Sequence, residues 1–407
     1  MNNENNEMED TREGRGSQTL NYLKNSIISD FKQHLQDPHV CSRFRPGQQR
    51  NRIPNKRAVE LASACVRLRR PGTLVFPRVR FSLYRWLYAE SSLFPTISKD
   101  RREETCQFCA SEVAEVRTFE YLKPASLKDA LELLGRHGEK AKLVAGGTDL
   151  MVQWKKKIIS PEYVISLRNV PELSFVTYEG DLKIGSATTH RTLELSPIIR
   201  EHFPIILDAV SNLGSVQVRN SATIGGNICN AAPSADTAPP LLALDAVAHI
   251  AGPQGERAVP IAEFFKGPSR TVLASGEIVT HFSIARPSPN TGMAYWKHTR
   301  RKAMDLPILG VAVLLSFGAD GRTCTKARIG LGVAAPTPMR ARKAEAFLEG
   351  KAVDRAVLDE AGKTAAGEAS PRTTIRGSQW YREEMIRVLV RRTGMICIER
   401  AKGAAQG

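Results

Sequence analysis

The sequence has no apolar run long enough to cross a membrane, few cysteines and no internal repeat. The longest apolar candidate, residues 307–319, is interrupted by glycines and falls short of the roughly 18 residues that span a bilayer, so we expect no transmembrane helix. The seven cysteines form only one close pair, which argues against a disulfide framework and favours a reducing cytoplasm. Without a fixed period, solenoids and propellers are not expected.

The sequence also lacks the spacing of a metal site. Cys106 and Cys109 form a CxxC pair, but no second pair completes a zinc or iron–sulfur site. The eight histidines show no HxxxH or similar pattern. We therefore predict no metal site in this chain.

Positive charge is concentrated in one segment near the start of the chain. Residues 43–85 contain twelve arginines or lysines and one acid, Glu60, and thus carry +11 of the formal net charge of +16. The segment contains several prolines and no helical or strand period, so we expect residues 1–113 to be a basic, poorly ordered extension. A tail that binds nucleic acid or a membrane surface is the alternative, although the arginines show neither a helical face nor a base-stacking pattern, and we expect no nucleic-acid partner. Translation from a start near Val113 is a third interpretation.

The remainder of the chain predicts two α+β regions. Ser126 and the apolar positions after it predict a helix that begins near Leu127 and ends near Gly135 or Gly138. Gly180 predicts a hairpin turn, and Pro204 should end or kink a helix over residues 198–213. Residues 222–238 have the composition of a long loop, which in a compact domain is usually functional. Further strands are expected at 142–145, 164–167, 175–178 and 182–185, and a helix at 150–157.

After residue 289 strands come first and helices follow, which predicts a separate α+β domain. The strands are expected at 293–297, 309–317 and 326–333, and the helices at 341–348, 354–366 and 379–392. We place the boundaries of the chain at 1–113 for the extension, 114–289 for the first domain, 290–400 for the second and 401–407 for a tail.

Two glycine pairs about eighty residues apart are the candidates for a ligand site. Gly146 and Gly147 lie between an expected strand and an expected helix, and Gly225 and Gly226 lie in the expected long loop. Glycine reaches positive φ and leaves its N–H accessible, so two such loops could hold both ends of a pyrophosphate. The first loop lacks the third glycine of a Rossmann GxGxxG motif. Since Asp149 would repel a phosphate, we expect it to cap the following helix; an ordinary strand-to-helix turn is the plainer alternative.

The order of five segments resembles one known family. They are LVAGGTDL, RNSATIGGN, SADTAPPLLALDA, YWKHTRRKAMDLPILGVAV and RGSQWYREEMIRVLVRR, and the similarity extends from about Thr118 to Arg400. The family is the flavin-binding medium subunit of the molybdenum hydroxylases, which contains xanthine dehydrogenase, carbon monoxide dehydrogenase and 4-hydroxybenzoyl-CoA reductase. The resemblance implies an α+β fold, in which a two-subdomain FAD-binding domain of the vanillyl-alcohol oxidase type precedes a small α+β C-terminal domain.

The resemblance also implies which residues contact the cofactor. Asp236 matches an acid that hydrogen-bonds FAD, Lys297 a lysine near the flavin, and Ile278 an apolar residue that packs against it. The alternatives are that Asp236 caps a turn, that Lys297 is a solvated strand end, and that Ile278 is simple core. Backbone N–H groups of two segments are implied to wrap the pyrophosphate: Leu143, Val144, Ala145, Gly146, Gly147, Thr148, Asp149 and Leu150, and then Thr223, Ile224, Gly225, Gly226 and Asn227.

The implied activity is electron transfer in a complex, in which the flavin performs the redox chemistry and no side chain of this chain is required as a catalytic acid, base or nucleophile. The family passes electrons between [2Fe–2S] clusters in a small partner and an external acceptor such as NAD, while a large partner holds molybdopterin. Thr148 stands where some flavoproteins of this fold have a covalently linked histidine, so dissociable FAD is expected. Cys229, Cys324 and Cys397 lie too far apart to form the extra cluster of certain relatives. A stand-alone FAD-dependent oxidoreductase of the same fold is the alternative, and a basic binding protein that uses residues 43–85 is a third.

Overall fold

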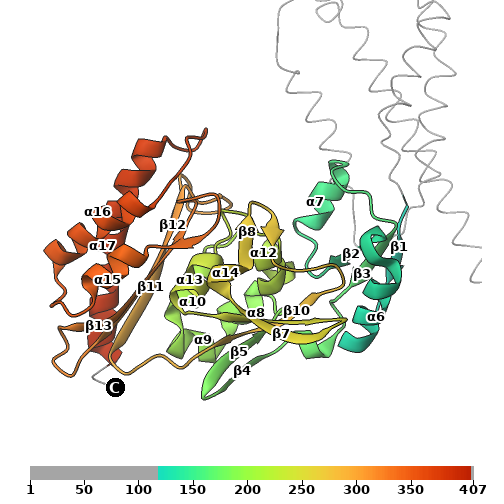
Figure 1. The fold of residues 1–407 in the computed structure, drawn as a ribbon, viewed down its shortest axis with the longest axis horizontal. Coiled ribbons are helices and arrows are strands. Elements are labelled where there is room, and N and C mark those ends of the chain that lie inside the picture. Colours follow the sequence, from blue (N-terminus) through green and yellow to red (C-terminus); the bar gives the residue numbers. More distant parts are fainter. Residues whose placement is uncertain (1–117, 405–407) are drawn as a thin grey trace, which may run out of the picture. The chain divides into compact units, whose positions relative to one another are not determined.

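The computed structural model describes residues 118–404, and the structural statements below concern these residues (Figure 1). The basic extension, its possible nucleic-acid role, the CxxC pair and the alternative start near Val113 lie outside the described residues. Three larger sheets follow one another along the described part of the chain, beside a fourth sheet of only two strands, and helices pack on them. Within the described part, no helix is long and apolar enough to cross a membrane.

The first sheet is small and parallel, with strand order β1-β3-β2. Helix α6 connects β1 to β2; Ser126 accepts a hydrogen bond from the N–H of Asp129, and Gly138 ends the helix at φ 52°. Both ends were predicted from sequence, because the capping residue and the glycine act locally. The elements are β1 (Glu120–Leu122), α6 (Leu127–His137), η1 (Gly138–Lys140), β2 (Ala141–Val144), α7 (Leu150–Lys155) and β3 (Tyr163–Ser166).

The second sheet has five antiparallel strands in the order β4-β5-β10-β6-β7. Gly180, at φ 93°, makes the predicted hairpin turn between β4 and β5. Strand β10 lies between β5 and β6, although it follows both in sequence. The elements are η2 (Pro171–Leu173), β4 (Val176–Glu179), β5 (Asp181–Gly185), β6 (Val247–Gly252), β7 (Gly255–Pro260) and β10 (Ile278–Ile284), with a separate hairpin of β8 (Phe265–Gly267) and β9 (Arg270–Thr271).

Short helices pack their apolar residues against one face of this sheet. The predicted break at Pro204 is confirmed, since α9 ends before it and α10 begins with it. The prediction that residues 222–238 form one long loop is wrong, because Thr223 caps a short helix within this segment. The helices are α8 (His190–Leu195), α9 (Pro197–His202), α10 (Pro204–Ser211), α11 (Val216–Ser221), α12 (Ile224–Cys229), α13 (Ala238–Ala243) and α14 (Ile261–Phe264).

The third sheet, with order β11-β12-β13-β14, is buried on both faces. Val311, Val313 and Leu315 of β12 belong to the core that includes the last three helices, while Ala312 and Leu314 belong to the core shared with α10 and α13. Helix α17 continues to Ala404, beyond the predicted end at residue 392 and into the expected tail. The elements are β11 (Thr291–His298), β12 (Leu309–Phe317), β13 (Cys324–Gly332), β14 (Met339–Arg340), α15 (Arg342–Leu348), α16 (Arg355–Glu368) and α17 (Gln379–Ala404).

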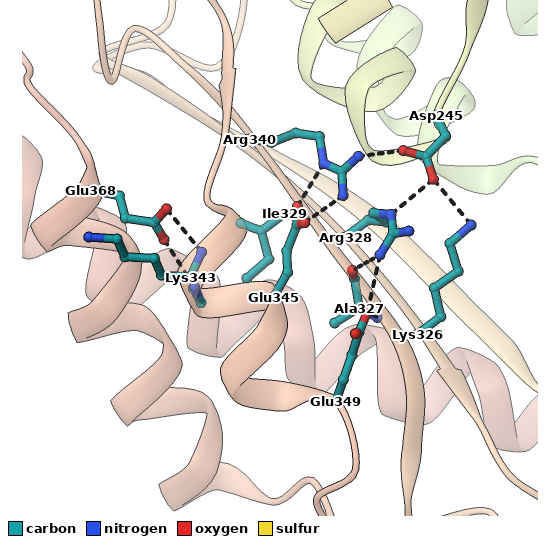
Figure 2. A network of polar contacts seen from close by, with 11 residues as sticks. Asp245, Lys326, Ala327, Arg328, Ile329, Arg340, Lys343, Glu345, Glu349 and Glu368 are labelled. Carbon is teal, nitrogen blue, oxygen red and sulfur yellow. Dashed lines mark hydrogen bonds and ion pairs between the residues drawn. The ribbon is translucent and has the colours of Figure 1, made fainter. Parts of the chain in front are cut away.

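A network of ion pairs joins the third sheet to the preceding part of the chain (Figure 2). Asp245, which follows α13 and has a φ of 51°, accepts from Lys326 at 3.1 Å, Arg328 at 2.9 Å and Arg340 at 2.5 Å. Arg340 also pairs with Glu345, which is buried. Networks hold their geometry better than isolated surface pairs. The network fixes β13 and β14 against the turn that follows α13.

Candidate functional site

Both glycine loops line one cavity of about 690 Å³, which is within the range of ligand sites. The cavity lies between the first sheet, α12 and β11. Ile224 is the exception among the predicted site residues, because it is fully buried in the core and does not line the cavity. The predicted residues that do line it are Leu143, Val144, Ala145, Gly146, Gly147, Thr148, Asp149, Leu150, Thr223, Gly225, Gly226, Asn227, Asp236, Ile278 and Lys297.

The first loop packs directly on the chain that leads into the second. A Cβ atom at Gly146 would overlap the backbone carbonyl of Ser221, so only glycine allows this close approach. Gly147 has a φ of 72°, which glycine adopts without strain. Glycine is therefore required at the two positions for different reasons. At Gly146 there is no space for a side chain, and at Gly147 the backbone has a positive φ.

The first loop offers free donors. Among the described residues, none accepts a hydrogen bond from the backbone N–H groups of residues 145–150. These N–H groups border the cavity, where an anion could accept from them. Asp149 stands at the N-cap position of α7, but its side chain makes no capping hydrogen bond, so the predicted capping role is wrong.

The second loop differs, because the fold uses its donors. The N–H of Ile224 donates to the carbonyl of Thr188 at 3.1 Å, and the N–H of Gly225 to the carbonyl of Ser186 at 2.8 Å. The N–H of Gly226 donates to the Thr223 hydroxyl at 3.1 Å. The N–H of residue 227 donates to the Thr223 carbonyl, within the first turn of α12. Residues 224–227 thus have no free backbone donor, unlike the expected wrapping of a pyrophosphate by both loops.

A buried ion pair lies in the wall of the cavity. The Lys297 ammonium group is 2.8 Å from Asp236 Oδ2, and both side chains are 6% exposed. Lys297 also donates to the carbonyl of Asn212 at 3.0 Å, and the Tyr295 hydroxyl donates to Asp236 Oδ1 at 2.9 Å. A solvated strand end is therefore wrong for Lys297, and Asp236 accepts from these two side chains rather than capping a turn. Burial raises the pKa of the Asp236 carboxyl above its usual value, although Lys297 and the Tyr295 hydroxyl oppose the shift.

Ile278 serves two environments at once. It is 2% exposed, packs in the core around the first sheet, and also lines the cavity. The core and cofactor interpretations of this residue are compatible, because one side of its apolar side chain can pack in the core while the other side faces the cavity.

The connection between β11 and β12 lies within the motif YWKHTRRKAMDLPILGVAV, but none of its residues was predicted to belong to the site. Met304, Asp305 and Leu306 line the cavity from this connection. Asp305 Oδ2 has almost no exposed surface and no hydrogen-bond partner among the described residues, while Oδ1 of the same carboxylate lies 3.5 Å from Arg301. A charged run between two apolar strands was the available signal. No group of three or more His, Cys, Asp or Glu with metal-site geometry occurs in residues 118–404.

The arrangement fits an extended, anionic ligand. Free N–H donors lie on one side of the cavity, and an ion pair lies in its wall. Two family models match this chain. Residues 117–287 match the FAD-binding domain in molybdopterin dehydrogenase, and residues 294–395 match the C-terminal domain of the CO dehydrogenase flavoprotein.

Relatives that are matched over nearly their whole length agree with the domain matches. The xanthine dehydrogenase FAD-binding subunit of Escherichia coli O157:H7 is 35% identical over 289 residues, covering 70% of this chain and 98% of the relative. The carbon monoxide dehydrogenase medium chain of Afipia carboxidovorans is 34% identical and covers 71% of this chain and 98% of the relative. The structure of carbon monoxide dehydrogenase from Hydrogenophaga pseudoflava superposes with a TM-score of 0.67 at 34% identity, covering 69% of this chain and 98% of that chain.

The fold and site define an α+β flavoprotein with a CO dehydrogenase-type C-terminal domain. This chain belongs to the FAD-binding medium subunits of the molybdenum hydroxylases, the xanthine dehydrogenase and carbon monoxide dehydrogenase family. The predicted family and fold class are confirmed, and the chain is a subunit of the FAD-dependent oxidoreductase class.

Proposed function

We propose that this protein binds FAD non-covalently and transfers electrons within a multi-subunit molybdenum hydroxylase. In this proposal the flavin exchanges electrons with [2Fe–2S] clusters of a small partner subunit and with an external acceptor such as NAD, while molybdopterin is held by a large partner subunit. We also propose a cytoplasmic location and domain boundaries at residues 114–289 and 290–400. The substrate would be determined in the large partner.

The single observation that supports binding is the shared cavity with its free donors. The N–H groups of residues 145–150 would hold the pyrophosphate, whereas the second loop would contribute through side chains and shape. Asn227 is one such side chain: its Oδ1 accepts from Thr237 at 2.6 Å, which fixes an amide group that lines the cavity. An arrangement in which only the first loop binds through backbone N–H groups fits the observed hydrogen bonds better than one in which both loops do so.

Asp236 and Lys297 would place two opposite charges, which sum to nearly zero, at fixed positions beside the ligand. Because both side chains are buried, their field is screened less than that of surface charges. A bound flavin supplies the redox chemistry, and the protein orients it and tunes its potential. Thr148 has no nitrogen nucleophile to offer, which supports a dissociable cofactor.

The proposal is tested on the full chain. We expect the purified protein to show flavin absorbance and to release FAD quantitatively on denaturation. A matched pair of variants locates the site: Lys297→Gln should weaken FAD binding by about tenfold or more, the loss expected for a hydrogen-bonded charge. Lys363→Gln, in an exposed pair with Glu360 on α16, should leave binding unchanged. A folded chain that takes up no FAD would contradict the proposal.

The partner assignment has its own test. Purification from the native cells should yield this chain together with one larger chain that contains molybdenum and one smaller chain that contains iron and sulfide. A stand-alone FAD-dependent oxidoreductase is the alternative, and a chain purified alone that reduces its flavin with an organic substrate would favour it.

A further inference from the structure

Tyr295 and Lys297 donate to the two oxygens of a single carboxylate. They are two residues apart on β11 and therefore point to the same face of the strand. The Tyr295 hydroxyl is 2.9 Å from Asp236 Oδ1, and the Lys297 ammonium group is 2.8 Å from Asp236 Oδ2. One strand of the C-terminal part thus fixes both oxygens of an acid that belongs to the preceding part.

Tyr295 stands behind this pair rather than in the cavity. Its side chain is buried, and it is not among the residues that line the cavity. Burial, followed by the charge of Asp236 and the hydrogen bond to it, raises the pKa of the phenol well above its usual value. The hydroxyl therefore remains a hydrogen-bond donor at every working pH and cannot exchange protons with a ligand.

The neighbouring strand leaves room for the hydroxyl. Gly310 of β12 is paired with Lys297, and a Cβ atom at Gly310 would lie only 2.6 Å from the Tyr295 hydroxyl oxygen. Any larger residue would have to displace the phenol or the strand. The contact between Tyr295 and Asp236 therefore depends on a glycine of the adjacent strand.

The backbone of β11 is fixed at the same place. The N–H of Tyr295 donates to Asp208 Oδ2 at 3.1 Å. Arg400, in the last turns of α17, donates to the two oxygens of Asp208 at 2.7 and 3.1 Å and to the carbonyl of Met293 at 2.8 Å. Helix α10, strand β11 and helix α17 are thus held together around the residue that bears the phenol.

We propose that Tyr295 is a positioning residue that fixes the Asp236 carboxylate, and through it the Lys297 ammonium group, in one orientation at the cavity wall. The inference rests on the proposed function, because it concerns how this pair meets FAD. Without the hydroxyl, one buried oxygen of Asp236 loses its donor. The carboxylate is then held ionised by Lys297 alone and becomes easier to protonate.

The test compares FAD binding by the full-length wild type and Tyr295→Phe across the neutral pH range. The ionised Asp236 carboxylate is the stronger acceptor, and it is the form that pairs with the charged Lys297 group. We expect Tyr295→Phe to bind FAD about tenfold more weakly than the wild type, and the difference to widen as the pH is lowered, because the carboxylate of the variant is easier to protonate. Unfolding of the flavin-free proteins is measured in parallel, so that a loss of fold is recognised.

The matched control is Tyr381→Phe, which removes a hydroxyl that bonds to His298 at 2.9 Å outside the cavity. It should keep the wild-type pH profile. In an Asp236→Asn background, Tyr295→Phe should no longer change the pH profile, because its effect passes through the carboxylate. Should Tyr295→Phe fail to fold, Gly310→Ala displaces the same hydroxyl and should give the same profile.

The outcomes separate the two proposals. Wild-type protein that binds FAD, with Tyr295→Phe or Gly310→Ala matching its affinity and pH profile, overturns the positioning role alone. A folded wild type without affinity for FAD overturns the proposed function and this inference with it.

Discussion

The two glycine loops have similar sequences but opposite hydrogen-bonding states. At residues 145–150 the backbone N–H groups have no acceptor among the described residues, whereas at residues 224–227 each N–H is hydrogen-bonded within the protein. The difference arises because α12 begins in the second loop and packs on the segment at Ser186. A glycine pair alone therefore does not indicate a free anion cradle; the donors must also lack partners.

The first glycine of each pair is the one that the structure needs most. Gly146→Ala should have the largest effect, because its Cβ would overlap the Ser221 carbonyl and separate the loops; we expect a loss of about 3 kcal/mol or more in the free energy of unfolding. Gly225→Ala should follow it, since its Cβ would lie 2.6 Å from the Ser186 carbonyl oxygen.

Urea denaturation measures both variants. The control is Gly135→Ala in α6, where no atom lies within 4 Å of the added methyl group and a gain of roughly 0.5–1 kcal/mol is expected. Equal stability of Gly146→Ala and the control would show that the loops are not in close contact.

Protonation of His190, which lies beside the second loop, should lower the free energy of unfolding. The His190 backbone N–H donates to the carbonyl of Ala222, next to the loop, and neither ring nitrogen has a partner among the described residues. Burial, reinforced by Arg219, lowers the pKa of the imidazole to about 4. The unfolded chain therefore binds the proton first as the pH falls, and on the order of 3 kcal/mol is lost between about pH 6.5 and pH 4.

Urea unfolding at a series of pH values tests this expectation. His190→Met replaces the imidazole with an apolar side chain of similar size that cannot be protonated. The substitution should flatten the dependence of stability on pH in this window. The same slope in the variant and the wild type would exclude His190 as its source.

The second glycine of the first pair is required for backbone conformation. Gly147→Ala should cost about 1–2 kcal/mol, because alanine is strained at a φ of 72°. The methyl group would also meet Met151 and Val144 at 3.3 Å, but both contacts are with side chains that can move. Gly147→Asn should cost less than alanine, since asparagine tolerates positive φ, and thermal unfolding ranks the two variants.

The second glycine of the second pair should matter least. Gly226 lies within α12, where alanine is favoured by roughly 0.5–1 kcal/mol, and its Cβ would approach only the Thr223 hydroxyl, at 3.0 Å. We expect Gly226→Ala to change stability by less than about 1 kcal/mol in either direction. A loss as large as that of Gly146→Ala would remove the distinction between the loops.

Local signals in the sequence predicted much of the fold. The Ser126 cap, the Gly180 turn and the break at Pro204 were all found, because each acts through its own backbone and near neighbours. The apolar run of β12 also matches its predicted bounds, 309–317. The order of five motifs was sufficient to identify the family, since residues that form one site recur in a fixed order.

Long-range contacts decided the rest. Asp236 meets Tyr295 and Lys297 across about sixty residues, and no local pattern shows that one strand supplies both donors. Met304, Asp305 and Leu306 reach the cavity only because β11 and β12 pack beside it. The sequence by itself determined the family and many of the elements, and every predicted site residue except Ile224 lines the cavity. Only the tertiary structure decided which backbone donors stay free, because a donor's partner is set by the packing of distant segments.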